Sequence, residues 1–362
     1  MEIIQASHEW ATRPNDQRFT SLSELKQSVE QRKKESWTAV TPAGKLQVFP
    51  TQDQDLIVSV FDPTQGEARQ ILPTNWAFGQ LAQYAKAPAA YLRSLPAELA
   101  AINLQWGLEH QPIRDEALIL ARTNGESTLR SMTSTTYGRI WDIDVVRSVE
   151  KVNRDGRWKI PSASYATQNP KRATTLYASD RDVFIFLVDD TNPVEVNGEK
   201  LFRGFYTWNS EVGSATFGLT TFLYRYVCDN RIIWGATEVK ELKIRHTGGA
   251  PERFAHEGAL YLQKYAEETT YKTVETIKKA SQFELPPSEK KQGSGWEDWL
   301  KSRGFTSTVA KQAIEKAKEE EGDARSLWDI VNGITAHARS IPYNDERTKL
   351  EAQAGKLLEV VA

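Results

Sequence analysis

The stretch L-F-R-G-F-Y-T-W at residues 201–208 decides the fold, because its side chains alternate as a β-strand requires. One parity is aromatic apart from a glycine and consists of Phe202, Gly204, Tyr206 and Trp208. The stretch T-F-L-Y-R-Y-V-C at residues 221–228 repeats the pattern, with Phe222, Tyr224 and Tyr226 on one parity. The sequence therefore predicts two strands whose aromatic residues share a face.

Further strands and a helix are expected around this pair. Asn124-Gly125 separates the apolar runs A-L-I-L-A-R and S-T-L-R-S-M, and Asn197-Gly198 follows the run V-F-I-F-L-V; both pairs accept the positive φ of a hairpin turn. After Pro251, apolar residues recur at helical spacing as far as Ala280, which predicts one long amphipathic helix. The predicted class is α+β, with a largely antiparallel central sheet backed by helices and a helical C-terminal region.

Composition shifts suggest four regions. Short helices broken at Pro88 and Pro96 characterise the N-terminal part, and Leu327, Val331 and Ile334 repeat at helical spacing near the C-terminus. The expected regions are a mixed α/β N-terminal lobe (1–116), a central β-rich domain with the long helix (117–285), a linker (286–295) and a helical C-terminal region (296–362).

The composition limits the classes of function. Lys plus Arg number 46 and Asp plus Glu number 48, so the formal charge is -2 and any polyanion site must be a local patch. Cys228 is the only cysteine, which excludes a disulfide framework or a multi-thiolate metal site within one chain. The start lacks the pattern of a secretory signal and no run is long and apolar enough to span a bilayer, so we expect a protein of the bacterial cytoplasm with no membrane partner.

Several blocks of the sequence resemble one family. They are Q-L-A-Q-Y-A-K-A-P-A-A-Y-L at residues 80–92, R-S-M-T-S-T-T-Y-G-R-I-W-D at 130–142, G-F-Y-T-W-N-S-E-V-G-S-A at 204–215, Y-R-Y-V-C-D-N at 224–230, R-H-T at 245–247 and S-L-W-D-I-V-N-G-I-T at 326–335. On these blocks the chain resembles the phage/plasmid-like family known as domain of unknown function 932. The family often has His or Asp where this chain has Glu211 and Val212.

The resemblance implies a protein of phages or plasmids, often encoded beside DNA-metabolism genes, and it implies no established catalytic residue. Together with the sheet pattern it favours a nucleic-acid partner, most plausibly single-stranded DNA in replication or recombination, with a homo-oligomer of the strand-annealing type as a further expectation. Cations that could meet phosphates lie beside aromatic residues that could stack on bases. The expected nucleic-acid-binding residues are Arg139, Arg203, Tyr206, Trp208, Arg225, Arg231, Lys243, Arg245 and His246.

Other interpretations remain open. Aromatic residues on one parity are also typical of a core beneath helices, in which case the charged parity faces solvent. Asp189 and Asp190 follow an apolar strand and could hold Mg²⁺ in a nuclease, with Glu195 as a third ligand; otherwise no cofactor is expected. A third hypothesis is a protein-binding anti-defence factor that uses Trp296, Trp299 and Trp328. The glycines at 213–220 resemble a phosphate-binding loop, but Leu219 replaces its lysine.

Overall fold

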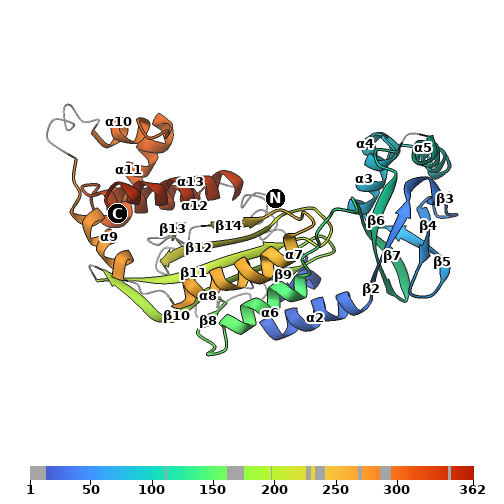
Figure 1. The fold of residues 1–362 in the computed structure, drawn as a ribbon. Helices are drawn as coiled ribbons and strands as arrows, with labels where there is room; N and C mark the ends of the chain where they lie inside the picture. Colours follow the sequence, from blue (N-terminus) through green and yellow to red (C-terminus); the bar gives the residue numbers. More distant parts are fainter. Residues whose placement is uncertain are drawn as a thin grey trace.

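The computed structural model describes residues 14–110, 112–160, 175–196, 198–225, 230–232, 241–267, 271–285, 295–340 and 344–362. The predicted α+β class is confirmed: two sheets and a group of C-terminal helices make up the molecule (Figure 1). The sheets belong to an N-terminal lobe and a larger central region. The expected linker at 286–295 lies outside the described residues except for Gly295, which begins a helix.

The N-terminal lobe contains a six-stranded sheet covered by helices. Its strand order is β2 (Ser36–Pro42), β6 (Glu116–Asn124), β7 (Glu126–Thr133), β5 (Glu67–Pro73), β4 (Leu56–Asp62) and β3 (Gln47–Pro50). The short 3₁₀ turn η2 (Ala43–Lys45) precedes β3, and the helices are α3 (Asn75–Tyr84), α4 (Ala89–Leu92) and α5 (Ala97–His110). Pro88 and Pro96 directly precede α4 and α5, as expected from proline's preference for helix starts. Leu81, Leu104 and Ile119 lie in the shared core.

The N-terminal lobe extends further along the chain than the sequence indicated. The hairpin β6–β7, which turns at Gly125 with a φ of 72°, was expected to open the central domain. Instead β6 pairs antiparallel with β2, and β7 pairs parallel with β5. These pairings join segments that are distant in sequence, so the local alternation of side chains does not reveal them. The six-stranded sheet therefore includes β6 and β7 and extends along the chain to Thr133.

Within the described residues the central sheet has eight strands. Its order is β1 (Arg18–Phe19), β9 (Leu176–Ala178), β10 (Val183–Val196), β11 (Glu199–Asn209), β12 (Phe217–Arg225) and β13 (Asn230–Ile232), with β8 (Trp158–Lys159) on β10 and β14 (Glu241–Ile244) on β12. All its pairings are antiparallel. Phe202 pairs with Tyr224 and Gly204 with Phe222, so the aromatic parities of β11 and β12 share a face, as predicted.

Helices cover the other face of this sheet. They are α2 (Leu22–Lys34), α6 (Asp142–Val152) and α8 (Ala259–Glu267), which lie below the sheet in Figure 1. Ile185, Phe205 and Leu219 project from the sheet into a core that includes Val146 and Leu262 from the helices. Helix α2 follows the 3₁₀ turn η1 (Asn15–Gln17) and the strand β1 and leads directly into β2, so it connects the two sheets.

The helical stretch expected after Pro251 is confirmed within the described residues. The chain forms α7 (Ala250–Arg253), a π-helical turn η5 (Phe254–Gly258) and α8 without interruption, and α9 (Tyr271–Gln282) follows residues 268–270, which lie outside the described part of the chain. Leu262 of α8 packs under the central sheet, whereas Ile277 of α9 packs with the C-terminal helices. The apolar residues of α8 and α9 recur at the same helical spacing, but the two helices pack into different hydrophobic cores.

The C-terminal region is helical, as predicted. It consists of α10 (Gly295–Lys301), α11 (Ser307–Glu321), α12 (Leu327–Arg339), α13 (Asn344–Leu357) and the turn η7 (Leu358–Val360). Val331 and Ile334 of α12 are fully buried and pack with Leu201 and Leu223 at one end of the central sheet. Trp299 and Trp328 are buried in this core as well, so packing explains both. Within the described residues, no helix is long and apolar enough to cross a membrane.

Candidate functional site: a buried polar junction and an open basic cleft

The aromatic face expected to stack on bases is interior. Tyr206 is 8% exposed and Trp208 is 2% exposed, and both lie in one aromatic cluster with Phe184, Phe186 and Phe222. The indole of Trp208 packs against Gly218, where a Cβ atom would come within 1.9 Å of the ring. Rings held against the sheet in this way are core residues. The burial of Tyr206 and Trp208 therefore supports the alternative interpretation, in which the aromatic residues of this parity form a core.

The expected arginines divide into buried, exposed and undescribed side chains. Arg203 is buried, donates to the backbone oxygen of Tyr265 and lies 4.3 Å from the centre of its ring, so it holds α8 against the sheet. Lys243 and Arg245, on and just after β14, are exposed and remain candidates. Arg225 and Arg231 lie on β12 and β13, but their side chains are outside the described part of the chain.

His246 is half-buried and belongs to a packed aromatic pair. Its ring stacks on Tyr137 with 5.0 Å between centroids, and its Nδ1 lies 3.0 Å from the backbone oxygen of Gly138. Burial lowers the pKa of His246 to about 4, so the ring is neutral at pH 7. A neutral, stacked imidazole offers no charge to a phosphate, and its contacts explain it as packing between β14 and the chain before α6.

The geometry at Asp189 does not support the magnesium hypothesis. Its buried carboxylate accepts from the backbone nitrogen and hydroxyl of Thr191 at 3.0 and 2.7 Å and from the backbone and side-chain nitrogens of Asn192, both at 3.3 Å. These are the hydrogen bonds of a turn-forming aspartate. Asp190's side chain is outside the described residues, and Glu195 pairs with Lys200 at 3.5 Å. Nowhere in the described ranges do three or more His, Cys, Asp or Glu side chains gather as metal ligands.

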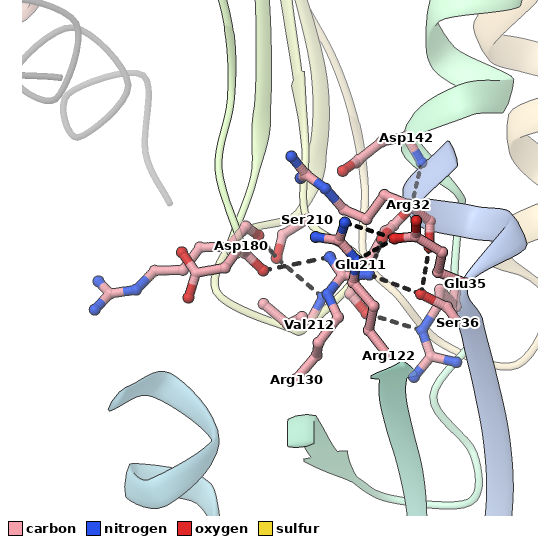
Figure 2. Close-up of polar contacts among 12 residues, drawn as sticks. Arg32, Glu35, Ser36, Arg122, Arg130, Asp142, Asp180, Ser210, Glu211 and Val212 are labelled. Atoms are coloured by element: carbon pink, nitrogen blue, oxygen red, sulfur yellow. Dashed lines mark hydrogen bonds and ion pairs between the residues drawn. The ribbon is translucent and has the colours of Figure 1, made fainter. Parts of the chain in front are cut away.

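The most concentrated set of buried charges lies where the two lobes meet. We call it the junction, and it centres on Arg130 of β7, Asp142 at the start of α6, Arg139 before it, and Glu211 in the loop after β11. Arg130 and Glu211 are 3% and 1% exposed, and their side chains are 2.7 Å apart. Figure 2 shows them pointing toward each other from opposite lobes. A bond of this kind between charged groups is short and strong.

Glu211 also organises the start of α6. Its second carboxylate oxygen accepts from the backbone nitrogen of Asp142 at 2.9 Å, and its backbone oxygen accepts from Nε of Arg139 at 2.9 Å. Burial lowers the pKa of Arg139 to about 10, so this guanidinium stays charged at pH 7. Burial and, next, the nearby Glu211 carboxylate raise the pKa of Asp142 well above its usual value. Asn209 Nδ2 donates to Asp142 Oδ1 at 2.7 Å, which favours the ionised form and opposes that shift.

The loop carrying Glu211 is fixed to both lobes. Trp76 Nε1 and Gln80 Nε2 of α3 donate to the backbone oxygen of Val212 at 3.0 and 2.8 Å. Tyr137 donates its hydroxyl to the backbone oxygen of Ser210 at 2.9 Å, and burial raises the pKa of this phenol, so it remains a donor. Three of the blocks that carried the family resemblance, at residues 80–92, 130–142 and 204–215, therefore meet here. Arg130, Asp142 and Glu211 all lie within those blocks, but the sequence alone did not identify them as interaction partners.

A second group of cations is open to solvent. A cleft of about 250 Å³ lies between α6 and α8 and is lined by Ser148, Lys151, Val152, Arg154, Arg157, Ala259, Gln263, Ala266 and Glu267. We call it the basic cleft. Arg157 is held in place, since it donates to the backbone oxygen of Ala266 at 2.5 Å and lies 5.3 Å from the centre of the Trp158 ring. Asp155 lies 3.6 Å from the Arg157 side chain.

The other two cations of the basic cleft are available for a ligand. Lys151 and Arg154 are exposed, and among the described residues neither has an ion-pair partner. Glu267, the one carboxylate of the lining, accepts from Gln263 Nε2 at 2.8 Å. The cleft therefore carries a local excess of positive charge on a chain whose net charge is -2. The run K-V-N-R-D-G-R at 151–157 was the sequence signal for it, and the sequence analysis missed it.

Comparison with known proteins gives a family and no activity. A family model described as a domain of unknown function (DUF932) matches residues 98–349, more than half of the chain, and includes both the junction and the basic cleft. No curated protein and no solved structure matches the sequence. The resemblance based on the sequence blocks is thus confirmed, while function has to be argued from the surface of this chain.

Proposed function

The chain belongs to the DUF932 family, and we propose that it binds single-stranded nucleic acid by the phosphate backbone at the basic cleft. The observation that carries this proposal is the convergence of Lys151, Arg154 and Arg157, of which Lys151 and Arg154 are exposed and lack ion-pair partners among the described residues. Cations in such a position gain from meeting phosphates, because the nucleic acid releases its condensed counterions when they do.

Binding of this kind is dominated by electrostatics. The aromatic residues expected to stack on bases are buried, so the stacking contribution of ~1 to 3 kcal/mol per base that is typical of single-strand binders does not come from them. Lys243 and Arg245 at the sheet edge offer a second set of exposed cations. The setting that fits this activity is replication or recombination of phage or plasmid DNA in the bacterial cytoplasm, where a homo-oligomer would extend the contact along a strand.

Fluorescence anisotropy with a labelled oligothymidylate tests the proposal. The paired change Lys151→Ala and Arg154→Ala should weaken binding roughly tenfold or more at low salt, because two charge-assisted contacts are lost. The slope of log affinity against log salt, measured between ~50 and ~200 mM, should become shallower by about 1.4, since each contact with a single strand contributes about 0.7.

A control pair and a comparison pair, each with the same change in charge, make the test specific. Lys311→Ala with Lys318→Ala, on exposed positions of α11, should leave affinity and salt slope unchanged. Lys243→Ala with Arg245→Ala measures the contribution of the sheet edge. The proposal is wrong if micromolar protein at low salt leaves the anisotropy unchanged, or if the Lys151 and Arg154 pair matters no more than the α11 pair.

A further inference from the structure

Helix α5 in the N-terminal lobe is apolar on two sides. Its inner side buries Ala101, Leu104 and Leu108 in the lobe core. Its outer side carries Leu99, Ile102 and Trp106, which are 49%, 63% and 53% exposed. The spacing of these three residues places them on one stripe. A helix with apolar residues on both sides is usually buried on both sides, so the outer stripe is a surface that lacks a partner within the described lobe.

The outer stripe borders a groove. Between α5 and the edge strand β3 lies a groove of about 420 Å³ lined by Val48, Pro50, Glu98, Ala101, Ile102, Gln105, Trp106 and Glu109. In Figure 1, α5 and β3 lie at the outer end of the lobe. Trp106 stacks on His110 with 5.0 Å between ring centroids and an interplanar angle of 14°. Its indole is therefore already ordered at the groove, as an anchor residue of an interface should be.

The edge of β3 is closed to an added strand. Gln105 of α5 accepts from the backbone nitrogen of Val48 at 2.8 Å and donates to the backbone oxygen of Leu46 at 3.1 Å. Pro50 has no backbone N–H to donate. Neither Val48 nor Pro50 therefore offers a backbone donor to a peptide that would extend the sheet, and the backbone acceptor of Leu46 is already occupied. An occupant of the groove must therefore bring side chains to it, which an amphipathic helix does without using its own backbone.

The charges of the groove select the type of helix. Its lining includes the carboxylates of Glu98 and Glu109 and no Lys or Arg. The two carboxylates are held by Gln54 and Gln105, at 3.2 and 2.7 Å respectively. They lie near opposite ends of α5, about 16 Å apart along its axis. A second copy of this chain would set like charges against each other in an antiparallel pair of α5 helices, whereas a helix with cations flanking its apolar stripe would complement both ends.

We propose that the groove between α5 and β3 docks an amphipathic helix of a partner protein, with apolar side chains against Ile102 and Trp106 and with Lys or Arg near Glu98 and Glu109. This surface is separate from the basic cleft, and it would bring the chain to a protein partner rather than to nucleic acid. The exposed stripe, the ordered tryptophan, the closed strand edge and the acidic ends all favour the same occupant.

Fluorescence polarisation with synthetic helices tests this inference. The probe is a labelled peptide with Leu at positions i, i+3, i+4 and i+7 and Lys at both ends; its matched control has Glu in place of each Lys. The full-length chain should bind the Lys peptide and prefer it to the Glu peptide. Trp106→Ala should lower the affinity at least about tenfold, as removal of a central tryptophan does. The pair Glu98→Lys and Glu109→Lys should reverse the preference between the peptides.

Trp106 is half exposed, so Trp106→Ala should retain the far-ultraviolet circular dichroism and thermal midpoint of the parent chain. Ile102→Ser provides a second variant with the same expected loss of binding. Absence of binding to the Lys peptide, equal affinity for both peptides, or full binding by Trp106→Ala would overturn the inference. So would sedimentation showing that the chain dimerises and that Ile102→Ser disperses the dimer, because the occupant would then be a second copy.

Discussion

In the junction the guanidinium of Arg130 is 3% exposed and lies 2.7 Å from Glu211, whereas Lys151 and Arg154 in the basic cleft are exposed and have no ion-pair partner among the described residues. Both regions are rich in cations, but only in the cleft can a cation meet a ligand without losing a partner. A buried ion pair ties its members to each other, because separating them leaves a charge in a medium that solvates it poorly.

The junction residues that carry the family resemblance are therefore not the residues that are accessible to a ligand. The sequence blocks around Arg130, Asp142 and Glu211 meet in the junction, where the Arg130–Glu211 pair joins the two lobes and the backbone nitrogen of Asp142 donates to Glu211. The cleft residues lie in a stretch that carried no block of resemblance. In this chain the arginine of a resembling block, Arg130, has a structural role because it is buried and ion-paired. A cation that could bind a ligand is identified instead by its exposure to solvent and its lack of an ion-pair partner.

The largest effect should come from breaking the junction. Arg130→Ala leaves the Glu211 carboxylate buried without its cation, and loss of one partner from such a pair costs about 3 to 5 kcal/mol of unfolding free energy. Chemical denaturation followed by circular dichroism measures this loss. The double variant Arg130→Met with Glu211→Gln removes both charges, keeps an acceptor for the backbone nitrogen of Asp142 and should recover much of it. A loss below about 1 kcal/mol in the single variant would show that the pair is not isolated from solvent.

A smaller effect should follow from the raised pKa of Asp142. Because the folded pKa lies above the unfolded value, protonation of Asp142 stabilises the fold at low pH. This contribution to the unfolding free energy is present below the unfolded pKa, which is near 4, and is lost as the pH rises from there through the folded pKa. The loss amounts to at most about 1.4 kcal/mol per pH unit. Asp142→Asn keeps the side chain neutral, so it should be more stable than the parent chain at pH 7 and show a flatter pH profile.

Unfolding free energies of both chains between pH 4 and 8 measure this difference. Asp144→Asn, two residues further along α6 at a partly exposed position, is the matched control and should leave the profile unchanged. If Asp142→Asn destabilises the chain equally at every pH, Asp142 does not titrate between these pH values and the raised pKa has no role in stability there.

The fold was partly predictable because strand alternation is a local property. The parities of residues 201–208 and 221–228 specified which side chains share a face, and the register Phe202 with Tyr224 agrees with them. Alternation could not specify which strands pair across long distances, so β6 and β7 were expected in the wrong lobe. Nor could it show that both faces are covered, which is why Tyr206 and Trp208 were plausible as a binding surface.

The functional surfaces were harder to predict because each is made by two segments. Lys151, Arg154 and Arg157 follow one another at short spacing, but they line a cleft only because α8 packs beside α6. The groove of the N-terminal lobe likewise needs α5 against β3, about fifty residues away in sequence. The sequence of one segment shows its charges or its apolar stripe. It does not show the concave surface, which forms only when a second segment packs beside it.

The smallest effect on stability should come from the basic cleft, and this sharpens its contrast with the junction. Lys151 and Arg154 are exposed and have no ion-pair partner among the described residues, so replacing both with Ala should change the unfolding free energy by no more than about 0.5 kcal/mol. The same variant should still lose affinity for oligothymidylate. Denaturation of the parent, the cleft variant and Arg130→Ala in one buffer compares the regions directly. A loss of stability near that of Arg130→Ala would make the cleft cations structural, and their effect on binding could no longer be attributed to contact with phosphate.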